Sequence, residues 1–290
     1  AIGISFTFIQ QGRASFSRIL DLLKTENDVP DMGDKRLDGF HQLCVKNLTF
    51  SYPGSDRPIL KNVSFDLNAG ETLGIVGSIG SGKSTLVDLL CRLYPVPEGT
   101  IYYNNVPVEQ LEKKSLRRTV SLVPQDAFLF SKKIQDNIAL GRNEWTFDEV
   151  KSMSELVNIA AEIDEIPDAY NAYLGERGVN LSGGQKQRLT IARALMADTP
   201  VIIFDDSLSA VDAKTEKNIL QSLRSRYLAG KKRVTVILVS HRVASLKWAD
   251  RILVLNEGHV EAFGSHEELM EGSSTYRHLV ELQSEGRSLA

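Results

Sequence analysis

Cysteine is scarce in this sequence, with only Cys44 and Cys91 among 290 residues. The two lie far apart and form no C-x-x-C spacing or histidine pairing, so neither a disulfide framework nor a structural zinc site is indicated. This usage fits a reducing compartment, and we expect both side chains to behave as small buried hydrophobes.

Positive charge is not in surplus either. The formal net charge is −3, which gives no support for a nucleic-acid partner. Long apolar runs are also missing, since none approaches the ~18 residues that cross a bilayer. Residues 1–9 are apolar but carry no basic start and no cleavage-like site, so they do not read as a signal peptide. They are either the start of a soluble helix or the severed end of a transmembrane helix.

What is present is ordinary globular composition, 42% hydrophobic and 24% charged, with room for one large or two modest domains. Residues 10–24 carry apolar side chains at helical spacing and predict an amphipathic helix. The acidic stretch 25–39, punctuated by proline and glycine, predicts a linker. We therefore divide the chain into residues 1–40 and a main domain, residues 41–290.

The main domain begins with strand-like alternation around residues 43–52 and 63–65, broken by turns. A helical insert of mixed charge follows at residues 148–172. The runs 73–76, 201–204 and 234–239 are continuously apolar, as in parallel strands buried on both faces, and 252–255 is a further strand. Strands alternating with helices predict an α/β core with a parallel sheet.

A phosphate-binding loop follows the strand at 73–76 and precedes a leucine-rich helix at 86–93. The pattern G-x-x-x-x-G-K-[ST] is met by Gly77, Ser78, Ile79, Gly80, Ser81, Gly82, Lys83 and Ser84, with Thr85 next. Glycines let successive backbone N–H groups curl around phosphate oxygens at the helix N-terminus. Lys83 can reach the β- and γ-phosphates, and the Ser84 hydroxyl can ligate Mg²⁺. The sequence therefore predicts an ATP site rather than an empty glycine-rich turn.

A carboxylate that positions Mg²⁺ is expected on a neighbouring strand of such a site. Asp205 ends the apolar run 201–204, and the carboxyl ends of strands are where α/β sheets place ligands. Asp206 follows directly. The plain alternative is a pair of solvated turn residues, but after a matched phosphate loop the metal role for Asp205 is favoured.

A second glycine-rich segment that opens a helix is formed by Leu181, Ser182, Gly183, Gly184 and Gln185. One nucleotide needs a single phosphate cradle, so the second suggests service to a nucleotide held by another subunit. This run resembles the signature motif of ATP-binding cassette (ABC) ATPases, and the resemblance covers nearly all of residues 41–290. It implies a P-loop NTPase (RecA-like) core with an antiparallel β-subdomain and an α-helical signature subdomain.

Several further residues take their roles from this resemblance alone. Tyr52 is similar to the aromatic that stacks on adenine, and this role is favoured over the alternative of a half-buried strand tyrosine. Gln125 resembles the glutamine that reaches Mg²⁺ and the attacking water, and His241 the histidine that contacts the γ-phosphate. Ser209 and Asp212 flank a loop that crosses the dimer interface, with Val211 where leucine is more usual.

The resemblance also implies partners and a location. Two such domains pair head to tail around ATP and Mg²⁺, and drive alternating access in an attached transmembrane domain at the cytoplasmic face of a membrane. Residues 175–178 (GERG) resemble a loop specific to exporters, and residues 8–19 resemble the segment that joins the last transmembrane helix to this domain. We therefore expect an exporter half-transporter, and favour the transmembrane origin of residues 1–9.

One position departs from the family pattern. The residue after the magnesium aspartate is normally the glutamate that polarises the attacking water, and here it is Asp206. Its carboxylate is withdrawn by roughly 1–1.5 Å, one carbon–carbon projection. Misplacement by ~1 Å often costs about a hundredfold in rate. We expect slow hydrolysis at this site and an intact signature that serves a partner subunit in a heterodimer.

Four alternatives stay open. The subunit can form a homodimer with two slow sites, or an extra water can bridge the gap at Asp206. It can also be a regulatory half-site that binds ATP without useful hydrolysis. A soluble ABC ATPase of DNA repair or translation is a third class, but coiled-coil, zinc and basic insertions are missing between these motifs.

Overall fold

The computed structural model describes residues 2–24, 29, 31, 33–175, 178, 180–228 and 234–284, and it divides the chain at residues 31 and 32 into two units. The first unit contains one helix, α1 (Ile2–Lys24), which includes the helix expected at residues 10–24 and begins eight residues earlier. Phe16, Ile19 and Leu23 are exposed along it. No helix among the described residues is long and apolar enough to cross a membrane.

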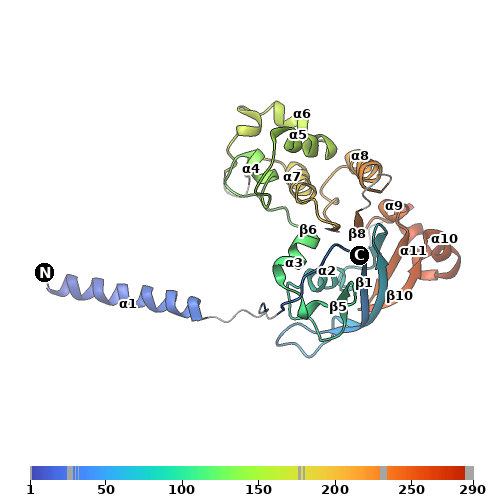
Figure 1. Ribbon diagram of the computed structural model, residues 1–290, viewed down its shortest axis with the longest axis horizontal. Coiled ribbons are helices and arrows are strands. Elements are labelled where there is room, and N and C mark those ends of the chain that lie inside the picture. The colour runs from blue at the N-terminus through green and yellow to red at the C-terminus, as the bar shows by residue number, and fades with distance from the viewer. Residues whose placement is uncertain are drawn as a thin grey trace. The chain divides into compact units, whose positions relative to one another are not determined.

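The second unit is built on a six-stranded sheet with the order β10-β9-β3-β8-β7-β6 (Figure 1). Five neighbouring strands are parallel and β10 is antiparallel, as the alternation of strands and helices predicts. The strands are β3 (Thr72–Val76), β6 (Val120–Val123), β7 (Val201–Asp205), β8 (Thr235–Val239), β9 (Arg251–Asn256) and β10 (His259–Gly264).

Side chains of this sheet alternate between two hydrophobic cores. Ile203 and Ile237 face the core shared with the small sheet, whereas Phe204 and Leu238 face the opposite one. Helix α2 (Lys83–Leu90) packs in the first core, and three helices from the C-terminal third of the chain pack in the second. These are α8 (Ala213–Leu223), α9 (Val243–Leu246) and α11 (Ser274–Ser284). Burial on both faces explains the continuous apolar runs in the sequence.

A four-stranded antiparallel sheet precedes and flanks α2, with the order β2-β1-β4-β5. Its strands are β1 (Gln42–Phe50), β2 (Leu60–Asn68), β4 (Ile101–Tyr103) and β5 (Val106–Pro107), followed by the 3-10 helix η1 (Val108–Gln110) and α3 (Lys113–Thr119). Inward-facing Leu43, Val45 and Leu48 are fully or almost fully buried. The predicted antiparallel β-subdomain is confirmed.

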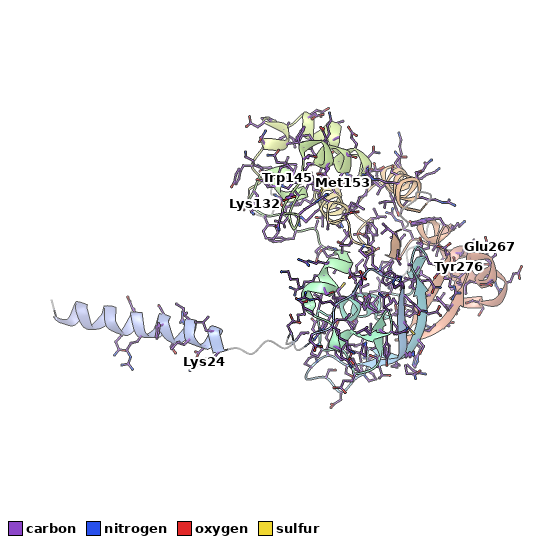
Figure 2. All side chains as sticks on the ribbon, viewed as in Figure 1. Lys24, Lys132, Trp145, Met153, Glu267 and Tyr276 are labelled. Carbon is purple, nitrogen blue, oxygen red and sulfur yellow. The ribbon has the colours of Figure 1, made fainter. Side chains whose placement is uncertain are left out.

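The helical subdomain occupies one end of the unit (Figure 1). It contains α4 (Ile134–Ile138), α5 (Phe147–Leu156), α6 (Ala160–Asp164), the 3-10 helix η2 (Ala169–Asn171) and α7 (Gly183–Met196). Met153 is buried there and Trp145 packs on the same core (Figure 2). A helical subdomain that carries the signature was predicted from the sequence, and the structure confirms it.

The remaining elements are the π-helical turn η4 (Arg224–Leu228) and α10 (His266–Gly272). The C-terminal helices contribute to the hydrophobic core, because the Tyr276 ring of α11 is completely buried (Figure 2). Burial raises the pKa of its hydroxyl to about 12. The cysteines differ from expectation: both are free and only half-buried, although Cys91 packs against the core beside α2.

Candidate functional site

Four parallel strands end at one edge of the large sheet, and each is followed by predicted site residues. In spatial order these strands are β3, β8, β7 and β6. The register pairs Ile75 of β3 and Asp205 of β7 with Val239 of β8, and Phe204 of β7 with Val123 of β6. The phosphate-binding loop, His241, the Asp205–Asp206 pair and Gln125 therefore gather along this edge, although they span more than half of the sequence.

The phosphate-binding loop connects β3 to α2 and takes backbone conformations that favour glycine. Gly80 has φ +77° and Gly82, the N-cap of α2, has φ +99°. The Lys83 Nζ donates hydrogen bonds to the carbonyl oxygens of Gly77 (2.9 Å) and Ser78 (2.7 Å). Its ammonium thus lies inside the curl of the loop, at the N-terminus of a helix, where anions bind.

The hairpin turn between β9 and β10 supports the loop from the side. A Cβ on Gly77 would lie 2.0 Å from the Leu255 carbonyl oxygen, so only glycine permits this approach. The Gly258 N–H donates to the Ser81 carbonyl (3.2 Å), and a Cβ on Gly258 would lie 2.2 Å from the Ile59 carbonyl oxygen. The turn between β9 and β10 therefore fixes the shape of the loop.

The pKa of Lys83 is lowered to about 8. Burial away from water is the largest cause, and the negative charges of Asp206 and Asp205 oppose it. A phosphate adds further negative charge beside the ammonium and would raise this pKa again. The two carboxylates alone therefore do not restore the pKa of Lys83 to its usual value.

Ser84 and Asp205 are joined by a hydrogen bond of 3.2 Å between the hydroxyl and the carboxylate. Asp205 is buried, and that burial raises the pKa of its carboxyl while the Ser84 hydrogen bond lowers it. Two oxygen donors beside a phosphate-binding loop suit Mg²⁺, which keeps waters and phosphate oxygens as its other ligands. Within the described residues, no group of three or more His, Cys, Asp or Glu side chains is placed to hold a metal ion.

Asp206 and His241 face each other, with 3.8 Å between the carboxylate Oδ2 and Nε2. That separation is too long for a direct hydrogen bond between the two side chains. Burial, followed by the charge of Lys83, lowers the pKa of His241, while Asp206 and Asp205 raise it. The neutral imidazole is therefore the main form near pH 7.

The backbone of Asp206 is clamped on both sides. Its N–H donates to the Val239 carbonyl of β8 (3.1 Å), and its own carbonyl accepts from the Ser209 N–H (3.2 Å) and hydroxyl (2.7 Å). The residue has φ +44°, in the left-handed region that aspartate tolerates. Its Cα position is therefore set by the sheet and by the interface loop, and the carboxylate can reach only as far as its single methylene allows.

Tyr52 follows β1 and lies next to the phosphate-binding loop. Its hydroxyl is 2.9 Å from the Thr85 hydroxyl, and its ring packs edge-on against Phe50 and Tyr94, with centroids 5.3 and 5.0 Å away. The ring is half-buried, so one part of it remains open to solvent. No pattern in the sequence predicted the Thr85 or Tyr94 contacts.

Gln125 is exposed just beyond β6, at the far end of this row of strands. The loop that carries it is held by α7, because the Gln187 side chain donates to the Pro124 carbonyl (3.2 Å). Helix α7 of the helical subdomain thus contacts the loop that carries Gln125. This link between α7 and the sheet edge was not apparent from the sequence.

The signature opens α7 as predicted. Ser182 is the N-cap, and a capping box joins its hydroxyl to the Gln185 N–H and the Gln185 side chain to the Ser182 N–H. The Gln185 amide also donates to Glu162 (2.9 Å), which pairs with Arg188 through two bonds of 2.6 and 2.9 Å. This ion pair braces the signature against α6, and only the three-dimensional structure reveals Glu162.

The interface loop passes close to the signature of the same chain. A Cβ on Gly184 would lie 3.3 Å from the Ala210 carbonyl oxygen. Asp212 caps α8 by accepting from the N–H groups of Lys214 (3.1 Å) and Thr215 (3.0 Å), and these bonds lower the pKa of its carboxyl. Val211 is buried, so the branched side chain fills the place of the more usual leucine. Of the exporter-type loop, Glu176 and Arg177 lie outside the described residues.

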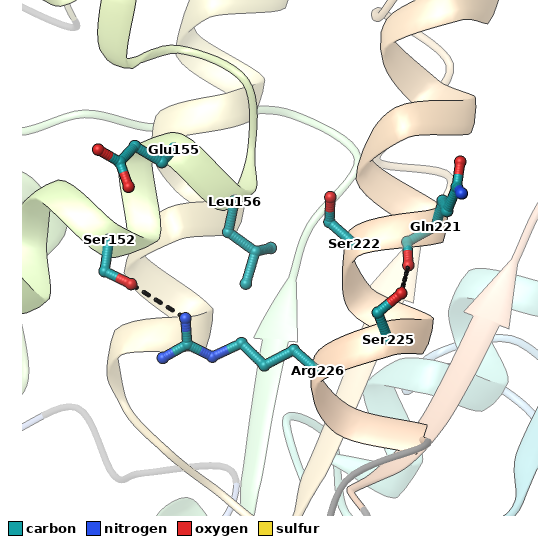
Figure 3. Close-up of a pocket in the computed structure, with 7 residues that line it drawn as sticks. All are labelled: Ser152, Glu155, Leu156, Gln221, Ser222, Ser225 and Arg226. Atoms are coloured by element: carbon teal, nitrogen blue, oxygen red, sulfur yellow. Dashed lines mark hydrogen bonds between the residues drawn. The ribbon is translucent and has the colours of Figure 1, made fainter.

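A separate cleft of about 610 Å³ lies between α5 and α8 (Figure 3). A hydrogen bond of 3.0 Å from the Arg226 guanidinium to the Ser152 hydroxyl crosses it, and Ser225 donates to the Gln221 carbonyl on its other wall (Figure 3). Its lining includes none of the predicted site residues. We therefore place the nucleotide site at the sheet edge and not in this cleft.

Comparison with known proteins agrees with the geometry. Residues 60–209 match the family model described as "ABC transporter". The chain is 40% identical over 283 residues to the multidrug resistance-like ATP-binding protein MdlA of Escherichia coli K12, covering 98% of this chain and 47% of that protein. It is 41% identical over 243 residues to the mitochondrial iron-sulfur clusters transporter ATM1 of Debaryomyces hansenii, covering 83% and 34%.

A solved structure of a bacterial Atm1-family ABC exporter with ATP bound superposes with a TM-score of 0.88 at 35% identity, covering 98% of this chain and 49% of that one. The chain thus spans about half the length, or less, of the relatives it matches. The fold, the order of its motifs and these likenesses lead to one conclusion. The chain belongs to the ABC transporter family, as an exporter-type ATP-binding domain.

Proposed function

We propose that this chain binds MgATP at the sheet edge and powers export through a membrane domain, with slow hydrolysis at its own site. The observation that carries the proposal is the convergence of Lys83, the Ser84–Asp205 pair and the Asp206–His241 pair on one edge. The family hydrolyses ATP to drive transport, and this geometry supplies a group for each part of that task.

Each group has a defined role in this scheme. Lys83 exchanges its bonds to the Gly77 and Ser78 carbonyls for phosphate oxygens, and the backbone N–H groups of the loop donate alongside. Ser84 and Asp205 would hold Mg²⁺, which when bound neutralises charge on the phosphates. His241, neutral near pH 7, can donate from its ring toward the γ-phosphate, while Asp206 orients and polarises the attacking water.

The slow step follows from the position of Asp206. Hydrogen bonds to Val239 and Ser209 hold the Asp206 backbone, and a forward shift that compensates for the missing methylene would have to break them. The carboxylate remains ~1–1.5 Å short of where a glutamate would place it, and ~1 Å of misplacement can cost about a hundredfold in rate. An inserted water that bridges the gap is the alternative, and it predicts near-normal turnover.

A second subunit supplies the signature for this nucleotide in our proposal. Ser182 and Gly183 are exposed at the N-terminus of α7, where backbone N–H groups and the helix dipole favour an anion. This chain's own signature is braced by Glu162 and is intact, so it can complete the site of a partner. We favour a heterodimer whose partner carries the glutamate, over a homodimer with two slow sites.

Similarity to relatives supports the exporter assignment. MdlA is named as multidrug resistance-like, ATM1 as an iron-sulfur clusters transporter, and the solved structure as an exporter. We infer that a membrane domain accompanies this domain, which then works at the cytoplasmic face of the membrane. A purely regulatory half-site is the second candidate, favoured by Asp206 alone. It predicts that turnover with a partner depends only on the partner's glutamate.

Nucleotide-dependent dimerisation tests the proposal directly. We expect the wild-type chain to sediment as a dimer with MgATP and as a monomer with MgADP, because slow hydrolysis preserves the closed state. Lys83→Ala removes the phosphate contact and should stay monomeric with either nucleotide. Equal sedimentation of wild type in ATP and ADP, with ATP shown to be bound, would contradict pairing around the nucleotide.

A further inference from the structure

Glu216 is a buried carboxylate in the first turn of α8, with only 5% of the residue exposed. It lies one turn after Asp212, the N-cap at the end of the interface loop. A buried charge is stable only when it is paired and hydrogen-bonded. The residues that pair with Glu216 therefore indicate the role of this buried carboxylate.

Both partners lie in the segment that carries His241. The Arg242 guanidinium and the Ser245 hydroxyl each donate a short hydrogen bond to the Glu216 carboxylate, one to each oxygen. Ser245 is buried, and Arg242 is the residue directly after His241. One carboxylate thus ties the N-cap and the first turn of α9 to α8.

The segment is held on the other side of His241 as well. The Ser240 N–H donates to the Ile75 carbonyl of β3 (3.2 Å), and the Ser240 hydroxyl accepts from the Arg242 N–H (2.9 Å). These bonds fix the backbone before and after His241 relative to the phosphate-binding strand. They leave the direction of the Arg242 side chain to be set by Glu216.

The helix that follows packs closely on the phosphate-binding strand. A Cβ on Gly74 would lie 3.3 Å from the Leu246 side chain, so α9 sits directly on β3. The Ser245 N–H also donates to the Arg242 carbonyl (3.1 Å), closing the first turn of α9. Glu216 therefore adds side-chain contacts to the backbone hydrogen bonds that flank His241.

We propose that Glu216 is a positioning residue that aims His241 and couples it, through α8, to the interface loop that ends at Asp212. The inference rests on the proposed ATPase function. Removal of the carboxylate breaks the hydrogen bonds of both Arg242 and Ser245. The segment that carries His241 is then no longer held in place against α8. Nucleotide affinity depends mainly on the phosphate-binding loop and remains.

The test compares Glu216→Gln and Glu216→Ala with Glu155→Gln, which removes an exposed helical carboxylate outside the site. All are made in the full 290-residue chain that carries Asp206→Glu, so that turnover is measurable. We expect kcat to fall about tenfold or more in Glu216→Ala, with the Kd for MgATP within about twofold. Glu216→Gln, which keeps a hydrogen-bonding oxygen, should lie between Glu216→Ala and the control.

A spectroscopic readout separates positioning from simple stability. In the nucleotide-free protein we expect the imidazole NMR signals of His241 to shift in both Glu216 variants, while those of the other four histidines stay as in the control. Glu216→Gln conserves size, so it remains informative if Glu216→Ala does not fold. Unchanged His241 signals, with kcat per folded molecule equal to the control, would overturn the inference.

Failure of the proposed function gives a different result. In that case the parent chain itself binds no ATP or shows no turnover, whatever stands at position 216. The imidazole signals still report on the role of Glu216 in that protein, because they need no nucleotide. The double variant Glu216→Ala with Arg242→Ala should lose no more than either single variant, as expected of two ends of one tether.

Discussion

The affinity for ATP should fall as the pH rises through 8, because Lys83 binds phosphate as an ammonium. Burial lowers the pKa of Lys83 from 10.5 to about 8 in the nucleotide-free chain. Most of the protein carries the charge at pH 7, and only about a tenth carries it at pH 9. Apparent affinity scales with the competent fraction, so Kd should rise about tenfold over this interval.

Calorimetric titration of a non-hydrolysable ATP analogue at pH 7, 8 and 9 measures the effect. Lys83→Arg is the matched control, since a guanidinium stays protonated throughout and its affinity should be nearly flat. An equal Kd for wild type at pH 7 and pH 9 would refute the electrostatic account of the loop.

The stability of the nucleotide-free chain should move in the opposite direction. The unfolded state binds a proton at Lys83 with a pKa near 10.5 and the folded state with a pKa of about 8. The unfolded state therefore holds more protons between these values, and the Lys83 contribution to stability rises with pH across that window. The raised pKa of Cys91 acts with the opposite sign, because it makes stability fall as the pH rises. The contribution of Lys83 is therefore measured as the difference in the free energy of unfolding between wild type and Lys83→Met across this pH window.

Three further predictions concern metal, stability and loop shape. Ser84→Ala should weaken the Mg²⁺ dependence of nucleotide binding by about tenfold, measured by Mg²⁺ titration at fixed ATP, whereas an unchanged midpoint contradicts its role as ligand. Thr146→Ala breaks the capping box of α5 and should cost about 1 kcal/mol, lowering Tm by ~2–4 °C with ATP affinity intact. Gly258→Ala places a Cβ 2.2 Å from the Ile59 carbonyl at φ +83°, and should both destabilise the chain by about 1–3 kcal/mol and weaken ATP binding, because Gly258 holds Ser81. A Gly258→Ala protein with wild-type Tm and Kd would show that the turn does not shape the loop.

The sequence predicted those site residues that directly follow buried strands. Asp205 ends an apolar run, and such runs are read reliably when both faces of a sheet are covered. Lys83 was predicted from the phosphate-loop motif after β3, and His241 from the family resemblance. The helix after the phosphate-binding loop was predicted to reach residue 93 and ends at Leu90. Arg92 takes φ +51° there, and no residue type signals that turn.

Contacts between distant segments could not be predicted. Strand β6 has only four residues and one of them is Ser121, so it showed no periodicity. Glu162 and Glu216 look like ordinary helical carboxylates in sequence, yet the fold brings each one to an arginine 26 residues away. Their burial and pairing depend on helix packing, which local patterns do not encode.

Steady-state ATP hydrolysis against protein concentration, for wild type and Asp206→Glu, tests the central claim most directly. The account predicts that wild type is nearly silent, while the glutamate variant turns over up to about a hundredfold faster and rises more steeply than linearly with concentration. That result would show a working site limited by one methylene and assembled between two chains. Wild type as fast as the variant would make Asp206 a competent base and would remove the reason for an asymmetric partner.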